Sequence, residues 1–218
     1  MEHLEIHLLG AFMVVCAGVQ IASLRAARLQ ALLAYLLLHR GAPQPRQRIA
    51  FLFWPETSDR QAQTNLRQLL HTFRQRIPHV DACLQVDEHT LTWRSSAPCT
   101  LDVAEFEAAL ATAAPRTGAA RIAALETAVA AYAGDLLPDC YDDWILAPRE
   151  QLAQKFVAAL EQLVLLHEER RSYAAAIAHA QRLLAYDPLH EATYRHLMRL
   201  HALNGDRAAA LRVYHTCV

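Results

Sequence analysis

Polar side chains that can hydrogen-bond to phosphates and base edges are concentrated in residues 60–74, on one face of a predicted helix. No carboxylate occurs from Arg60 to Val80, whereas a solvated helical face usually mixes both signs of charge. Arginine, glutamine and threonine on a rigid helix are typical of contact with the major groove of DNA. An ordinary solvated face is the competing interpretation, and the missing acids weaken it. The face consists of Arg60, Gln63, Thr64, Arg67, Gln68, His71 and Arg74.

The helix that carries this face is predicted over about residues 58–77. Its apolar residues recur at three- and four-residue intervals, which is the spacing of one buried stripe. Ser58 with Gln61 forms a capping-box start, and Pro78 ends the helix. The stripe consists of Ala62, Leu66, Leu69, Leu70, Phe73 and Ile77.

Position divides the cations and amides into two predicted roles. Residues on consecutive turns opposite the stripe are the candidates for reading base edges, namely Thr64, Arg67, Gln68 and His71. Arginines near the ends of this helix, at the start of the preceding one and beside a hairpin are the candidates for phosphate contacts. These are Arg46, Arg48, Arg60, Arg74 and Arg94.

The residues before this helix predict the elements that hold it. Alternating apolar residues predict short strands within residues 4–22. Ser23 is placed to cap a helix from Leu24 to about Arg40, and a short helix follows Pro45.

A hairpin is predicted after the helix. Residues 84–86 and 91–93 flank Asp87-Glu88-His89-Thr90, and residues 99–101 add a further strand. Strands, three helices and a hairpin, in this order, predict a winged helix-turn-helix of the OmpR type over residues 1–101, with its third helix in the major groove. The acidic hairpin tip argues against close contact between the hairpin and DNA.

Residues 102–218 are predicted to be almost entirely helical, including a long helix from about Pro148 to Arg170. Arg171–Ile177 recurs as Gly205–Leu211 at a spacing of 34 residues, which is the tetratricopeptide period. The fold is therefore predicted to be mainly α with small β elements, a winged helix-turn-helix followed by an α-helical tetratricopeptide-like bundle. The second repeat stops within its last helix, so we expect a fragment truncated at the C-terminal end.

Charge is distributed unequally along the chain. Residues 1–100 carry ten arginines and seven acids, whereas residues 101–218 carry eleven basic residues and fifteen acids. This asymmetry predicts an anionic partner for the first half only. Five scattered cysteines without a CxxC, no signal peptide and no apolar run of membrane length predict a cytoplasmic protein with reduced thiols and no membrane contact.

No grouping of residues predicts catalysis or a metal centre. His167-Glu168 lacks the second histidine of an HExxH motif, and His196 and His201 do not share a helical face. Asp142-Asp143 is better explained by helix capping than by acid–base chemistry. We therefore predict no enzymatic activity, no metal and no cofactor.

Seven segments, in order along almost the whole chain, resemble the Streptomyces antibiotic regulatory proteins and their relatives. This resemblance implies an OmpR-type winged helix joined to a bacterial transcriptional activator domain, sequence-specific binding of double-stranded DNA, often as a homodimer, and contact with RNA polymerase. The segments are Leu8–Phe12, Arg28–Leu38, Phe53–Glu56, Asn65–Gln68, Leu101–Phe106, Tyr141–Trp144 and Asp187–Glu191.

Two functions from different classes remain open. The first is a DNA-binding transcriptional regulator, an activator, that uses its helical domain (residues 102–218) to contact RNA polymerase or another protein. The second is a protein-interaction module whose winged helix does not bind DNA, suggested by the acidic hairpin tip and the near-neutral net charge of −1. The salt dependence of DNA binding distinguishes them.

Overall fold

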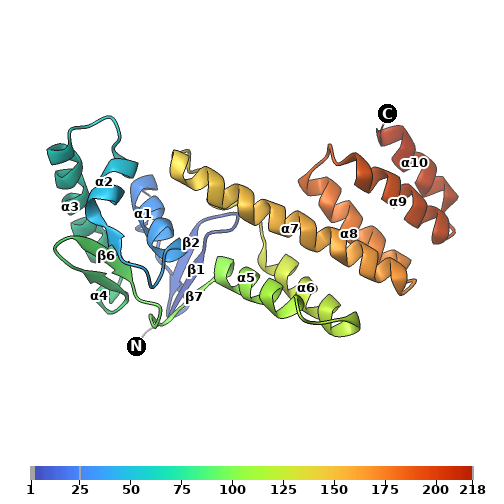
Figure 1. The fold of residues 1–218 in the computed structure, drawn as a ribbon, viewed down its shortest axis with the longest axis horizontal. Helices are drawn as coiled ribbons and strands as arrows, with labels where there is room; N and C mark the ends of the chain where they lie inside the picture. The colour runs from blue at the N-terminus through green and yellow to red at the C-terminus, as the bar shows by residue number, and fades with distance from the viewer. Residues whose placement is uncertain (1–2, 25, 218) are drawn as a thin grey trace. The chain divides into compact units, whose positions relative to one another are not determined.

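The computed structural model describes residues 3–24 and 26–217, which fold into two compact units (Figure 1). The first unit contains the chain up to Val103 together with Gly134–Arg149, and the second contains Ala104–Ala133 and the chain from Glu150 onwards. Val218, where the sequence predicts an interrupted repeat, lies outside the described residues. Helices predominate beside two small sheets, which confirms the predicted fold class.

A four-stranded sheet in the order β3-β2-β1-β7 begins the first unit. The strands are antiparallel except for β7, which runs parallel to β1 and so brings residues 99–101 beside the start of the chain. Alternation predicted these short strands because every second side chain of a strand faces the core. Their bounds are β1 Leu4–His7, β2 Met13–Cys16, β3 Val19–Gln20 and β7 Cys99–Leu101.

Helices and a hairpin follow the first three strands in the predicted order, with two short additions. A two-residue strand, β4, joins the hairpin to form a three-stranded sheet in the order β4-β6-β5, and a single helical turn, α4, precedes the hairpin. The bounds are α1 Ala27–Leu38, β4 Gln44–Pro45, α2 Arg46–Phe53, α3 Asp59–Arg76, α4 Val80–Cys83, β5 Leu84–Val86 and β6 Thr90–Trp93.

The predicted start of the first helix was wrong. Helix α1 begins at Ala27, and its N-cap residue, Ala26, makes no side-chain capping bond. Ser23 does not cap it, because its hydroxyl donates instead to the carbonyl oxygen of Arg76 at 3.4 Å. A tertiary hydrogen bond has replaced the local one that the sequence suggested.

The segment Gly134–Arg149 belongs to the first unit although helices of the second unit precede and follow it. The amide of Leu137 donates to the carbonyl oxygen of Leu8 at 2.9 Å, and that of Gly10 donates to Asp135 at 2.9 Å. A Cβ on Gly134 would lie only 3.1 Å from the Cα of Gly10, a tight contact with backbone, so the close approach favours glycine.

Asp102 closes the same region of the first unit. One carboxylate oxygen accepts from the amides of Leu8 and Leu9, both at 2.8 Å, and the other accepts from the amide of Val103 at 2.8 Å. The side chain therefore caps the first turn of helix α5, Asp102–Ala113, and also anchors the residues that follow β1. Burial raises the pKa of Asp102, and its bonds with the three amides oppose that rise.

The long helix α7, Asp143–Glu169, begins five residues before the predicted start at Pro148. Pro148 lies inside the helix near its start, where it removes one backbone hydrogen bond. Packing compensates: Ile145 is fully buried, and the ring of Trp144 stacks on Phe53 with centroids 6.0 Å apart. Tertiary contacts have outweighed the usual effect of proline on a helix boundary.

The second unit contains the remaining helices, and α8, α9 and α10 lie side by side (Figure 1). The predicted 34-residue repeat is visible in its turns, because Arg171 and Gly205 both have positive φ, 56° and 83°. In each turn the amide after this residue bonds back to a helix carbonyl at 2.9 Å, closing the helix end in the same way. The bounds are α5 Asp102–Ala113, α6 Gly118–Ala131, α8 Tyr173–Tyr186, α9 Glu191–Leu203 and α10 Arg207–Cys217.

Close packing of small residues joins these paired helices. Ala176 and Ala180 of α8 are fully buried and pack with Leu197 and Leu200 of α9. Alanine at these positions lets two helix backbones approach closely. No helix among the described residues is long and apolar enough to span a bilayer.

Candidate nucleic-acid interface

Helix α3 presents the polar face predicted from the sequence. Ser58 is its N-cap and accepts a hydrogen bond from the amide of Gln61 at 3.4 Å, so the helix lies within one residue of its predicted bounds. Ala62, Leu66 and Phe73 are buried, which leaves the arginine and glutamine side exposed. Local sequence thus determines both the position and the rotation of α3.

A groove of about 560 Å³ separates α3 from the hairpin tip. Gln63 and Arg67 line it from α3, Arg46 from the start of α2, and Glu88 and His89 from the tip. Its lining therefore combines arginine, amide and imidazole donors with a single carboxylate. Such donors can hydrogen-bond to phosphate oxygens and to purine acceptors.

Arg46 ties the hairpin tip to α2. Its amide donates to the carbonyl oxygen of His89 at 2.8 Å, and its guanidinium donates to that of Asp87 at 3.3 Å. Both bonds end on backbone carbonyls, and no carboxylate among the described residues forms an ion pair with the guanidinium of Arg46. These two hydrogen bonds therefore connect the hairpin tip to the start of α2, next to α3.

The two acids of the hairpin tip have different surroundings. The carboxylate of Asp87 accepts hydrogen bonds from Gln85 and Thr90, so it shapes the turn. The side chain of Glu88 is 88% exposed, and its carboxylate lies 4.0 Å from His89 Nε2. Of these two acids, Glu88 is the one that lines the groove and is exposed to a partner there.

The other three predicted base-reading residues do not line this groove. Thr64 is half-buried, and its hydroxyl donates to the carbonyl oxygen of Arg60 at 2.9 Å. Gln68 and His71 are exposed on the adjacent side of α3, and His71 Nε2 lies 3.0 Å from the side-chain nitrogen of Gln75. Of the predicted set, the structure places only Arg67 beside the hairpin tip.

The remaining predicted phosphate ligands are dispersed over the first unit. Arg48 and Arg60 are exposed. Arg74 forms an ion pair with Asp81 at 2.9 Å, and both side chains are largely solvent-accessible. The guanidinium of Arg94 donates to a carbonyl oxygen of α4, away from the hairpin tip.

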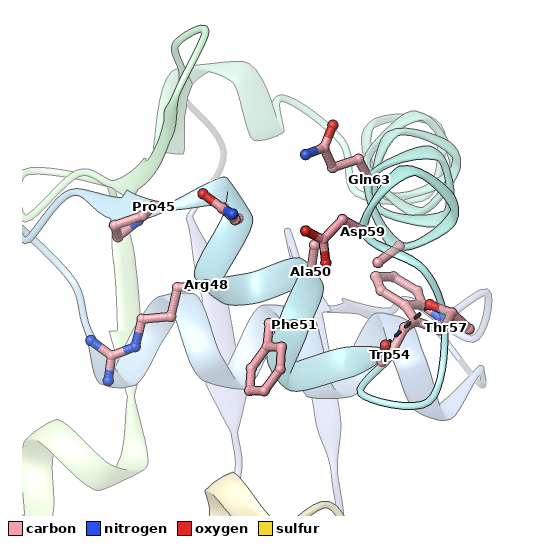
Figure 2. Close-up of a pocket in the computed structure, with 10 residues that line it drawn as sticks. Pro45, Arg48, Ala50, Phe51, Trp54, Thr57, Asp59 and Gln63 are labelled. Carbon is pink, nitrogen blue, oxygen red and sulfur yellow. Dashed lines mark hydrogen bonds between the residues drawn. The ribbon is translucent and has the colours of Figure 1, made fainter.

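A second, apolar groove of about 480 Å³ lies between α2 and the start of α3 (Figure 2). Phe51, which is 66% exposed, and Trp54 form its apolar lining, and Gln63 is common to both grooves. Figure 2 shows Arg48 leaving α2 on the side away from Gln63, so these two residues face different parts of the surface.

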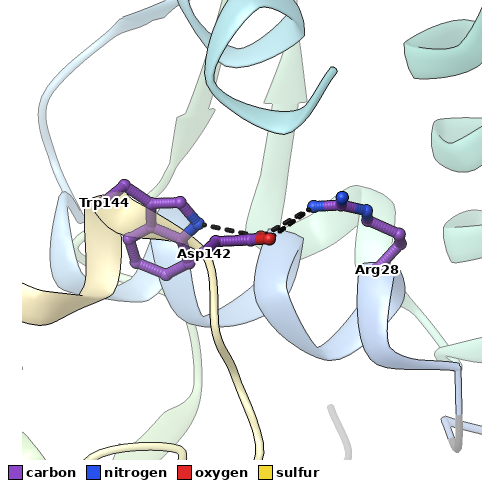
Figure 3. Close-up of polar contacts among 3 residues, drawn as sticks. All are labelled: Arg28, Asp142 and Trp144. Atoms are coloured by element: carbon purple, nitrogen blue, oxygen red, sulfur yellow. Dashed lines mark hydrogen bonds and ion pairs between the residues drawn. The ribbon is translucent and has the colours of Figure 1, made fainter. Parts of the chain in front are cut away.

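An ion pair between Arg28 and Asp142 lies next to the end of α2, where the guanidinium carbon of Arg28 is 5.9 Å from the centre of the Phe53 ring. The guanidinium of Arg28 donates to both carboxylate oxygens of Asp142 at 2.7 and 2.9 Å, and the indole of Trp144 donates to the same carboxylate at 3.3 Å (Figure 3). Trp144 stacks on Phe53 at the end of α2, so its ring packs within the first unit. Asp142 therefore has a structural role: it links Arg28 of α1 to Trp144 at the start of α7.

Comparison with known proteins identifies the family. Residues 101–218 match the model of the bacterial transcriptional activator domain. The chain belongs to this family. The fold of Mycobacterium tuberculosis EmbR, solved in complex with a low affinity phosphopeptide, matches all of this chain with a TM-score of 0.76 at 20% sequence identity. The chain spans 59% of the EmbR chain, and a search of curated proteins finds no match.

The match to the bacterial transcriptional activator domain confirms the domain that the sequence resemblance implied for the second half of the chain. At 20% identity the likeness to EmbR concerns the fold alone.

Within this member of the bacterial transcriptional activator domain family, sequence reasoning did not mention Gln47 and assigned no site role to two other groove residues, Gln63 of the polar face and His89. Gln63 precedes Arg67 by four residues, so helical spacing alone could have paired them. Gln47 and His89 could not be placed there, because pairing of β4 with β6 brings α2 to the hairpin tip.

Proposed function

We propose that this protein is a sequence-specific DNA-binding regulator that activates transcription by placing α3 in the major groove. The observation that carries the proposal is the exposed face of α3, free of carboxylates from Arg60 onwards, beside the unneutralised guanidinium of Arg46. An α-helix fits the width of the major groove, and its exposed amides and guanidinium groups can reach base edges.

The proposed roles follow position on this surface. Thr64, Arg67, Gln68 and His71 are proposed to read bases, with Gln63 added because it shares a groove with Arg67. Arg46, Arg48, Arg60, Arg74 and Arg94 are proposed to contact phosphates. The surface pair of Arg74 with Asp81 is weak enough to exchange for a phosphate, since exposed ion pairs contribute about 0–1 kcal/mol.

The helical unit is proposed to contact RNA polymerase or another protein, in the cytoplasm, and the protein is proposed to act as a homodimer on DNA. Family membership supports the protein contact, because the family is named for transcriptional activation. Two copies would double the phosphate contacts and set the spacing of two half-sites.

The test begins with selection of bound sequences from random duplex DNA, followed by titration of cognate and random duplexes. Arg67→Ala should weaken cognate binding by about 1–3 kcal/mol and relax preference at one base position. Arg74→Ala should weaken both duplexes equally and make the salt slope shallower by about 1. Arg207→Ala is the matched control, because it removes an exposed arginine from α10 in the other unit.

A salt slope of roughly −4 to −5, expected for about 4–6 phosphate contacts, supports DNA binding. If the folded Arg67→Ala and Arg74→Ala proteins match the parent and Arg207→Ala in affinity and selectivity, the proposal is wrong. The protein-interaction module would then be the better description, and Glu88 in the groove its structural basis.

A further inference from the structure

Three helices of the second unit bring two histidines and a glutamate together. Glu126 of α6, His167 of α7 and His179 of α8 place one potential ligand atom each within 4.8 Å of the others. His167 Nε2 lies 3.4 Å from a Glu126 carboxylate oxygen, and the two imidazole rings stack with centroids 5.3 Å apart. The three residues form the only such group among the described residues.

The environment of His167 indicates that a bound ligand contacts its Nε2 atom. The residue is only 9% exposed, and its buried Nε2 makes no hydrogen bond among the described residues, although the Glu126 oxygen lies within ion-pair distance. A buried polar nitrogen without a partner is costly, so native structures rarely leave one unsatisfied. The backbone is held in place as well, because the His167 carbonyl accepts from the amide of Ser172 at 2.9 Å.

We propose that Glu126, His167 and His179 bind a divalent transition metal ion of the zinc class. Two imidazole nitrogens and one carboxylate oxygen are a donor set that suits zinc, with water in the remaining position. Solvent can reach that position because the Glu126 side chain is 49% exposed. The ion would satisfy the orphaned nitrogen of His167 and connect α6, α7 and α8.

The charges around the site are compatible with this role. Burial lowers the pKa of His179, and the neighbouring His167 and Arg182 lower it further while Glu126 opposes them. Arg182 is the opposing positive charge, but its guanidinium is directed to the carbonyl oxygens of Val129 and Tyr132.

Sequence reasoning excluded a metal at His167 because an HExxH motif requires its second histidine one helical turn away. The second imidazole instead comes from the next helix, and the carboxylate from the preceding one. The spacing of 12 residues between the two histidines becomes a contact only when α7 and α8 pack against each other.

The test uses the whole chain, stripped with a chelator and then equilibrated with zinc chloride or cobalt chloride at pH 7.5. The parent should bind one more equivalent of zinc than His179→Gln or Glu126→Gln, and in these variants the dissociation constant should rise at least tenfold. Cobalt should give a visible absorption band in the parent alone. Zinc should raise the Tm of the parent and leave that of both variants unchanged, because the complete ligand set exists only in the folded state.

His190→Gln is the matched control. His190 Nε2 also lies 3.4 Å from a glutamate oxygen, that of Glu161, but no third ligand gathers there among the described residues. This variant should bind zinc as the parent does. Circular dichroism of each variant without metal separates loss of binding from loss of folding. Equal zinc affinity in the parent and in folded His179→Gln, or no zinc-dependent change in the parent, would overturn the proposal.

Discussion

Cationic side chains are held differently in the two units. In the first unit, Arg46 and Arg94 donate to backbone carbonyl oxygens, and the exposed face of α3 contains no acid after Asp59. In the second unit, glutamates pair with cations and histidines between helices, as Glu168 of α7 does with His196 and Arg199 of α9. Carbonyl contacts leave a net positive charge, whereas ion pairs cancel it.

This difference indicates which charges can serve a partner. An arginine that bonds only to carbonyl oxygens keeps its attraction for an anion, while one paired with a glutamate already contributes its charge to packing. Arg28 and Arg74 are exceptions in the first unit, since each pairs with an aspartate. Arg182 is an exception in the second unit, since its guanidinium donates to two backbone carbonyl oxygens. The predictions below alter one side of this contrast at a time.

The largest effect is expected from Leu66→Ala in α3. Leu66 is 1% exposed, so its truncation leaves a cavity beneath the polar face and should lower the free energy of unfolding by about 2–5 kcal/mol. Chemical denaturation measures this change. DNA affinity per folded molecule should remain at the parental value. Weaker DNA binding by a variant of unchanged stability would contradict the assignment of stability to the buried face of α3 and of DNA binding to its exposed face.

Asp102→Asn should lower the free energy of unfolding by about 2–3 kcal/mol, because an amide cannot accept from all three backbone donors. One terminal atom of asparagine is an NH₂ group, which would face either the amide of Val103 or those of Leu8 and Leu9. Urea unfolding at neutral pH tests it. An unchanged free energy of unfolding would contradict the prediction, because it would mean that the three amide bonds to the carboxylate add no net stability.

Glu168→Gln should cost about 1 kcal/mol of stability at neutral pH, since it removes the charge shared by His196 and Arg199. Burial alone would raise the pKa of Glu168, but its hydrogen bond to His196 and the charges of Arg199 and His196 outweigh burial and lower it. The contribution is therefore present above the ordinary glutamate pKa and is lost as the pH falls below about 4. Thermal melts from pH 7 to pH 3 should converge for parent and variant; parallel curves would contradict the charge-based account.

The smallest effect is expected from Glu88→Gln at the hairpin tip. Removing an acid that is 88% exposed should tighten DNA binding about twofold, roughly 0.4 kcal/mol, because one repulsion with phosphate disappears. Titration at low salt is the sensitive measurement. Asp87→Asn is a less suitable variant because it also removes hydrogen bonds that shape the turn. Weaker binding by Glu88→Gln would contradict the prediction and indicate that the Glu88 carboxylate accepts a hydrogen bond from a base.

Sequence alone determined the features that depend on neighbours within a few turns of helix or strand. The stripe from Ala62 to Phe73 sets the rotation of α3, and Ser58 sets its start, because both act through spacings of three and four residues. The 34-residue repeat likewise predicted the common turn that appears at Arg171 and Gly205. These interactions are local, so the order of residues contains the necessary information.

Only the tertiary structure decided which distant side chains meet. Asp102 captures the amides of Leu8 and Leu9, more than ninety residues away, and Arg28 pairs with Asp142 across 114 residues. The same holds for His167 and His179, whose rings approach only because α7 and α8 pack together. Such contacts depend on how strands and helices assemble, and many pairings satisfy the same local pattern, so no periodicity in the sequence could select among them.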